Sequence, residues 1–95
     1  MKVFDWDNGK NRKLSKERGI SFEAIVSLIE SGNILEIVTG RGNYAHQKQF
    51  IIEINKYVYV IPFAEDEKRI FLKTIIPSRK LTKKYLSGGK SNEED

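Results

Sequence analysis

The sequence predicts a single α+β domain in which helices cover a largely antiparallel sheet. Strand-type and helix-type patterns follow one another in the order β-α-α-β-β-β-β-α, so most strands are consecutive instead of alternating with helices. A length of 95 residues fits one domain and leaves no room for a second. A hydrophobic content of 39% and a charged content of 32% are typical of a folded globular chain.

The first elements are a short strand and a polar helix. Residues 2–6 alternate as a strand does, and Asp7 is a natural N-cap for a helix over residues 8–18. Gly19 is expected to end this helix in the left-handed conformation.

The next helix has the clearest amphipathic pattern in the chain. Ser21 is its expected N-cap, and Gly32-Asn33 is expected to close it. Apolar side chains recur between these points at three- and four-residue spacing, which predicts that this helix packs on the sheet. They are Phe22, Ile25, Val26 and Ile29.

A series of strands and one last helix complete the predicted domain. Asn55-Lys56 is a plausible two-residue turn, because Asn tolerates positive φ, although Lys suits its second position poorly. The remaining expected elements are a strand over 34–38, a loop over 40–46, strands over 48–54, 57–63 and 69–76, a charged turn over 65–68, and a helix over 79–86 after Pro77-Ser78. Residues 1–86 thus form the domain, and residues 87–95 a flexible polar tail.

Composition excludes several classes of protein. The chain has no cysteine, which removes disulfides, thiol catalysis and cysteine-bound zinc and fits a reducing cytoplasm. No apolar run approaches the ~20 residues of a membrane span, and the N-terminus lacks the apolar stretch of a secretory signal. We therefore expect a cytoplasmic protein that does not contact a membrane.

The charges are unevenly distributed. The net charge is +4, yet residues 68–84 contain seven bases and no acid, residues 1–20 are also basic, and the middle of the chain is acidic. Such a field attracts polyanions, and nucleic acid is the commonest one in a cytoplasm. The alternative is that Lys and Arg merely solvate two exposed helices.

The inventory for catalysis is small. His46 is the only histidine, and in a polar loop a lone histidine is more often a surface residue than a catalyst. No cluster of His, Asp and Glu has the spacing of metal ligands, and Gly40-Arg41-Gly42 lacks the rest of a phosphate-binding loop. We therefore expect neither a metal nor another cofactor.

Basic and aromatic residues are the remaining candidates for function. Lys10, Arg79 and Lys80 are candidates for handling phosphate, and RNA-binding candidates are Lys13, Lys83, Lys84 and Tyr85. If the first and last helices flank one edge of the sheet, these side chains line a groove for RNA. Each tyrosine, taken singly, is more typical of a core than of a stacking platform.

A small basic domain of this kind could cleave RNA without a metal, because RNA carries its own nucleophile. The 2′-OH attacks the adjacent phosphate, and the protein orients the backbone, moves a proton and neutralises charge on phosphorus. His46, a tyrosine or a lysine could transfer the proton, and the sequence does not choose among them.

Two residue patterns resemble the BrnT toxin family over residues 3–86. The first is Phe4-Asp5-Trp6-Asp7 with Lys10, followed by Gly19-Ile20-Ser21-Phe22-Glu23. The second is an isoleucine-rich strand followed by Ser78-Arg79-Lys80 and Thr82. The chain departs from the family at Glu17-Arg18, where Lys-His is common, and thereby loses a candidate for proton transfer.

The resemblance implies a ribonuclease toxin of a type II toxin–antitoxin pair with a fold similar to the RelE group. It also implies a cognate DNA-binding antitoxin, which neutralises the toxin and through which the complex reaches operator DNA. RNA is the implied substrate, and a homodimer is possible. By position, Trp6, Asp7 and Lys10 match the first pattern, and Arg79, Lys80 and Thr82 match the second. From the residues alone, Trp6 is better explained as a hydrophobic anchor and Asp7 as an N-cap.

Two rival functions use the same basic surface. One is a module that binds nucleic acid without cutting it, and the other is a protein-interaction unit whose basic surface is covered by an acidic partner. RNA binding with a steep salt dependence but without cleavage favours the first rival.

Overall fold

The computed structural model describes residues 2–40, 42 and 47–86 and confirms the α+β prediction. In these residues the elements are β1 (Val3–Asp5), α1 (Asn8–Arg18), α2 (Phe22–Glu30), β2 (Glu36–Thr39), β3 (Lys48–Ile54), β4 (Tyr57–Glu65), β5 (Arg69–Leu72), β6 (Ile76–Pro77) and α3 (Arg79–Leu86). The strands form one sheet of order β1-β5-β4-β3-β2, with β6 pairing β4 off this path. Every pairing is antiparallel except that of β1 with β5.

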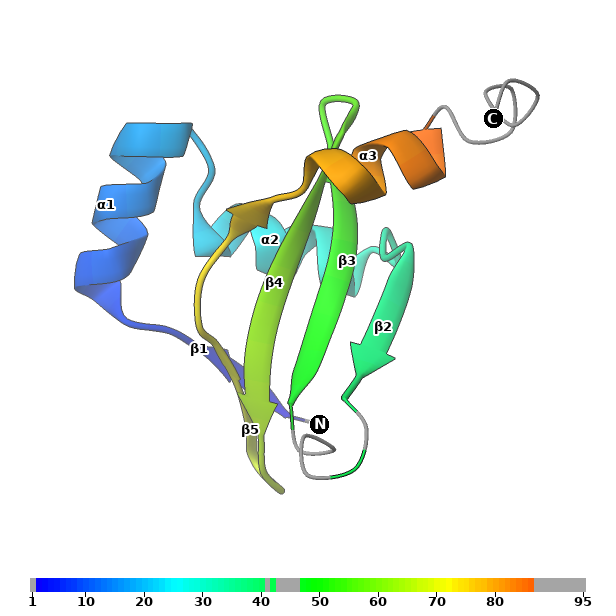
Figure 1. Cartoon of the computed structure of the whole chain (residues 1–95). Helices are drawn as coiled ribbons and strands as arrows, with labels where there is room; N and C mark the ends of the chain where they lie inside the picture. The colour runs from blue at the N-terminus through cyan, green and yellow to red at the C-terminus, as the bar shows by residue number, and fades with distance from the viewer. Residues whose placement is uncertain (1, 41, 43–46, 87–95) are drawn as a thin grey trace.

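The helices occupy three different places around the sheet. In Figure 1, α2 lies behind the central strands, α3 crosses in front of β3 and β4, and α1 stands beyond the edge formed by β1. The two sheet faces are therefore covered by different helices, and much of the front face below α3 carries no helix.

The two N-terminal helices begin and end where local chemistry predicts. The Asp7 carboxylate accepts a hydrogen bond from the Lys10 amide at 2.8 Å, and Gly19 closes α1 with φ of 71°. Ser21 caps α2 by accepting from the Ala24 amide at 3.1 Å. The side chain of Asn11 links the helices, because it accepts from the Phe22 amide and donates to the Glu23 carboxylate, each at 2.7 Å.

The main core lies between α2 and the rear face of the sheet. Phe22 and Ile25 of α2 are completely buried, and the Phe50 and Phe63 rings stack with their centroids 4.1 Å apart. The buried members of this core are Leu14, Ile20, Phe22, Ile25, Phe50, Ile52, Ile61, Phe63, Leu72 and Ile75. Ile51 and Val58 are also buried but belong to the other sheet face, on which α3 lies.

The strand predicted over residues 69–76 is interrupted, and Pro62 of the neighbouring strand β4 explains why. The Lys73 amide donates to the Pro62 carbonyl at 2.8 Å, but proline has no N–H with which to return the bond. The pairing then shifts by one residue, from Phe63 with Leu72 to Val60 with Ile76, which is a β-bulge. The prediction of one continuous strand is therefore wrong in detail, and β5 and β6 are separate.

Smaller differences concern the ends of strands. The strand predicted over 34–38 runs from Glu36 to Thr39, and the strand predicted over 57–63 continues to Glu65. The predicted tail over 87–95 lies outside the described residues, as does His46. Among the helices of the described ranges, none is long and apolar enough to cross a membrane.

The turn between β3 and β4 places a strained residue at a defined position. Asn55 and Lys56 have φ of 52° and 66°, the pair of positive values that a tight hairpin turn requires. We expect Lys56→Gly to raise the free energy of unfolding by about 1 kcal/mol, because glycine adopts positive φ without steric cost. Thermal unfolding measures the gain, and Lys56→Ala is the control that removes the charge but keeps the strain. Equal effects of the two substitutions would contradict the explanation.

Candidate nucleic-acid interface

Helix α3 presents its bases to solvent and its other side chains to the sheet. Leu81, Thr82, Tyr85 and Leu86 are half-buried. The four bases Arg79, Lys80, Lys83 and Lys84 are all exposed. Within the described residues neither Arg79 nor Lys80 has an ion pair or hydrogen-bonded side-chain partner, so both guanidinium and ammonium groups are available to an anion.

The start of α3 is joined to the sheet through one hydroxyl group. The Ser78 amide continues the ladder by donating to the Val58 carbonyl at 2.9 Å, but the Ser78 carbonyl has already turned into the helix. The Thr82 hydroxyl replaces this carbonyl as the acceptor for the Val58 amide, at 2.8 Å, and itself donates to the Ser78 carbonyl at 2.7 Å. Ser78 also caps the helix, since its hydroxyl accepts from the Leu81 amide at 3.1 Å.

The other end of α3 is held by Tyr85, which was expected from the sequence to bind RNA. Its hydroxyl donates to the carboxylate of Glu36 on β2, and this bond raises the pKa of Tyr85 above its ordinary value of 10.0. The Lys84 ammonium lies 5.4 Å from the centroid of the Tyr85 ring. Sequence reasoning missed Glu36, because a single acid in a short strand gives no sign of a partner on a distant helix.

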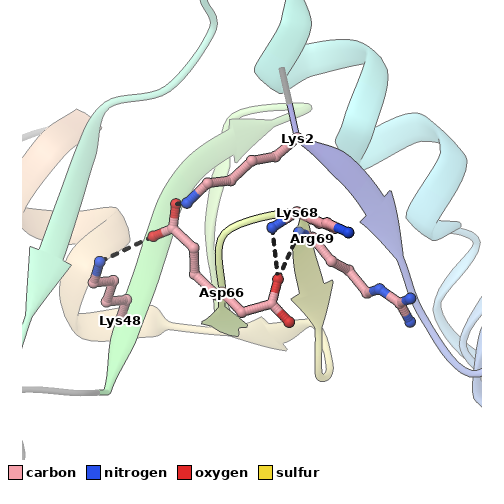
Figure 2. Close-up of polar contacts among 6 residues, drawn as sticks. Lys2, Lys48, Asp66, Lys68 and Arg69 are labelled. Carbon is pink, nitrogen blue, oxygen red and sulfur yellow. Dashed lines mark hydrogen bonds and ion pairs between the residues drawn. The ribbon is translucent and has the colours of Figure 1, made fainter.

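The bases near the turn between β4 and β5 are largely compensated by acids. Figure 2 shows Lys2 and Lys48 reaching Glu65, and the backbone amides of residues 68 and 69 donating to Asp66 at 2.8 Å. The Arg69 guanidinium is 3.1 Å from the Asp5 carboxylate. In the basic segment over 68–84, Arg69 is thus paired with an acid, whereas the bonds to Asp66 come from backbone amides and leave the Lys68 side-chain charge in place.

The bases of α1 occupy a separate surface. Lys10 and Lys13 are exposed, and α1 stands beyond the β1 edge while α3 crosses the front of β3 and β4 (Figure 1). The sequence-based picture of one groove lined by both helices required them to flank the same edge of the sheet, and the structure does not arrange them in that way.

Most residues of the first pattern have a structural role. The Trp6 ring stacks on Phe22 with centroids 5.8 Å apart, next to the main core, so it is the hydrophobic anchor that the sequence suggested. Asp7, Gly19 and Ser21 are helix caps. In this pattern, Lys10 is the one residue named as a functional candidate, and its side chain has no partner among the described residues.

The described residues hold no obvious centre for metal chemistry. Across residues 2–40, 42 and 47–86, no three His, Asp or Glu side chains are grouped so that they could hold a metal ion. The site that geometry supports best is the exposed basic side of α3, because its four bases reach solvent, together with the front face of the sheet beside it.

Comparison with known proteins gives a likeness to two solved structures. No protein-family model and no curated protein sequence matches the chain. The crystal structure of YafQ from E. coli strain BL21(DE3) is 9% identical with a TM-score of 0.49, and a point variant of YafQ from E. coli is 10% identical with a TM-score of 0.48. Each match covers 85% of this chain and 98% of the other. At these scores the likeness carries no argument about function.

The hydroxyl of Thr82 should be measurable as a stabilising group. We expect Thr82→Val to lower the free energy of unfolding by about 1–3 kcal/mol, because the buried Val58 amide then lacks an acceptor. Denaturant unfolding gives the value. Thr82→Ser is the matched control, because it keeps the hydroxyl, and it should lose much less. A loss for serine as large as that for valine would contradict the assignment of this stability to the hydroxyl group.

The ion pairs of Glu65 should make stability depend on pH. Hydrogen bonds from Lys2 and Lys48 hold the pKa of Glu65 below its ordinary value of 4.5. A carboxyl whose pKa is lowered by folding stabilises the fold above its unfolded-state pKa, and this contribution is lost as pH falls through the folded-state pKa. We expect Glu65→Gln to be less stable than the parent near neutral pH, with the difference vanishing as the pH falls well below 4.5.

Thermal unfolding at a series of pH values tests this dependence. Glu67→Gln is the control, since Glu67 is a neighbouring exposed carboxylate without an ion pair among the described residues. A stability difference for Glu65→Gln that does not change with pH would contradict the assignment.

Proposed function

We propose that this chain is a ribonuclease toxin of the BrnT type, belonging to a type II toxin–antitoxin pair and cleaving mRNA without a metal. The observation that carries the proposal is the row of exposed bases on α3, which coincides with the second sequence pattern, Ser78-Arg79-Lys80 with Thr82. Structural roles account for most of the first pattern, whereas Arg79 and Lys80 have no such role to explain them.

The chemistry needs only what RNA and a cationic surface supply. The 2′-oxygen forms a bond to phosphorus while the bond from phosphorus to the 5′-oxygen breaks, one group accepts the 2′-proton, and the leaving oxygen receives a proton. Arg79 and Lys80 bind the phosphate and neutralise the charge that develops on it, a task for which the guanidinium fork is well suited. Lys83 and Lys84 continue the same exposed surface along the RNA backbone.

The remaining candidates have more limited roles. Tyr85 is a poor general base near neutral pH, because its pKa is raised by the bond to Glu36, so its role here is contact with RNA. Lys10 and Lys13 lie on α1, away from α3, and would contact a more distant phosphate. His46 stays a candidate for proton transfer from the sequence alone.

Two partners follow from this function. The RNA substrate binds the basic surface, and a cognate DNA-binding antitoxin neutralises the toxin in the cytoplasm and carries the complex to operator DNA. Phe71 and Ile76 are 37% and 45% exposed on the sheet face that α3 only partly covers. Exposed apolar side chains beside a basic helix suit a protein partner, and they also favour the alternative of a purely protein-binding unit. A module that binds nucleic acid without cleaving it is the other alternative.

Induced expression in a bacterial host tests the proposal. The parent chain should arrest growth and produce new mRNA 5′ ends, and Arg79→Ala should lower mRNA cleavage by about 10²–10³-fold, because charge stabilisation on phosphorus is lost. Arg12→Ala is the matched control, since Arg12 is an exposed arginine on α1. Circular dichroism checks that each variant is folded.

Each failure has a distinct meaning. Intact mRNA with steeply salt-dependent RNA binding by the folded parent would replace the toxin with a binding module. Full toxicity of a folded Arg79→Ala variant would remove Arg79 from the active site.

A further inference from the structure

Within the described residues, strand β2 leaves one edge of the sheet unpaired. It is the last strand in the order β1-β5-β4-β3-β2, and Figure 1 shows no described element outside it. Natural sheets usually protect such an edge with lysine, proline, a bulge or a covering segment, because unpaired N–H and C=O groups attract another strand. The sequence of β2, Glu-Ile-Val-Thr, contains neither lysine nor proline and has a high β-propensity.

The register identifies which backbone groups are unpaired. The Gly40 amide donates to the Gln47 carbonyl at 2.8 Å, and Val38 lies opposite Gln49 in the same ladder. Because hydrogen-bonded pairs alternate along an antiparallel ladder, Val38 and Gly40 direct their backbone groups toward β3. Ile37 and Thr39 therefore direct theirs away from the sheet.

One large apolar side chain of this edge is well exposed. Ile37 of β2 is 54% exposed, whereas Leu35, 40% exposed, lies in the bend before the strand and donates its amide to the Ile51 carbonyl of β3. The one charged side chain of β2, Glu36, points to the opposite face and is hydrogen-bonded to Tyr85. No charge on β2 itself therefore opposes the approach of a second apolar strand to Ile37.

We propose that β2 pairs with β2 of a second copy of this chain, antiparallel and centred on Ile37. The two Ile37 residues would then face each other as a hydrogen-bonded pair, each using the N–H and C=O that point outward. In this register Glu36 lies opposite Val38 of the second copy. The edge is thus self-complementary: outward donors meet outward acceptors, the exposed isoleucines meet, and no like charges face each other.

The size of the edge sets the strength of the dimer. A strand of four residues buries less than the roughly 1,200 Å² of a stable interface, so the dimer should be weak and form only as concentration rises. The pairing lies at β2, whereas the proposed phosphate-handling bases lie on α3, so the inference does not depend on ribonuclease activity.

Analytical ultracentrifugation over a wide concentration range tests the pairing. The apparent mass should rise from 11.0 kDa toward twice that value. Ile37→Lys should abolish this rise, because it places two like charges opposite each other. Val3→Lys is the matched control, since Val3 is a 66% exposed apolar residue on the opposite edge strand, β1, and this variant should associate as the parent does. A parent chain that stays monomeric, which would leave the edge for a different partner, overturns the proposal, as does association that Ile37→Lys leaves unchanged.

A cross-linking experiment covers the case in which Ile37→Lys fails to fold. The chain has no cysteine, so Ile37→Cys introduces a single thiol. The Cα separation of about 5.5 Å in a hydrogen-bonded antiparallel pair is compatible with a disulfide. Mild oxidation should cross-link Ile37→Cys at least tenfold faster than Val3→Cys. Equal rates for the two variants would overturn the proposal.

Discussion

The backbone of β4 is the constraint on which the other elements depend. On one side it pairs with β3 along the full length of the hairpin, and on the other it must satisfy β5, β6 and the start of α3 in succession. That second side is irregular, because Pro62 has no N–H to donate and no strand carbonyl accepts the hydrogen bond of the Val58 amide. The bulge after Lys73 accommodates the missing N–H of Pro62, and the Thr82 hydroxyl accepts the hydrogen bond from the Val58 amide.

This arrangement fixes the basic helix in place without burying its charges. The Thr82 bridge holds the first turn of α3, and the Tyr85–Glu36 bond holds its last turn to a different strand. Between these points the bases alternate with half-buried residues and remain in water. The helix contributes no fully buried side chain, so its position depends on polar contacts more than the position of α2 does.

Local chemistry was sufficient to predict much of the fold. The bounds of α1 and of β3 agree with those predicted from the sequence. Asp7, Gly19 and the Asn55-Lys56 turn end these elements through conformations that each short segment favours by itself. The break between β5 and β6 could not be predicted in this way, since the effect of Pro62 depends on which strand its missing N–H faces. Which neighbouring strand Pro62 faces is decided by the pairing register of the whole sheet, and a short segment of sequence does not reveal it.

The candidate site was predictable in composition but not in arrangement. The bases that the charge pattern points to on α3 are exposed, and Leu81 and Tyr85 among them are half-buried. The pairing of Tyr85 with Glu36 and the separation of α1 from α3 both depend on contacts between segments distant in the chain. Periodicity within a segment contains no information about such contacts.

The parallel pairing of β1 with β5 constrains the order in which the strands can join the sheet during synthesis. Val3 lies opposite Arg69 and Asp5 opposite Phe71, so the two strands are neighbours in the sheet although most of the domain's sequence lies between them. On a ribosome the chain emerges from its N-terminus, and the β3–β4 hairpin can close from neighbouring residues alone. Because β5 is the strand with which β1 pairs, β1 cannot join the sheet until β5 has left the ribosome. Of the described strands, β1 is thus made first but joins the sheet only after β5 has been made.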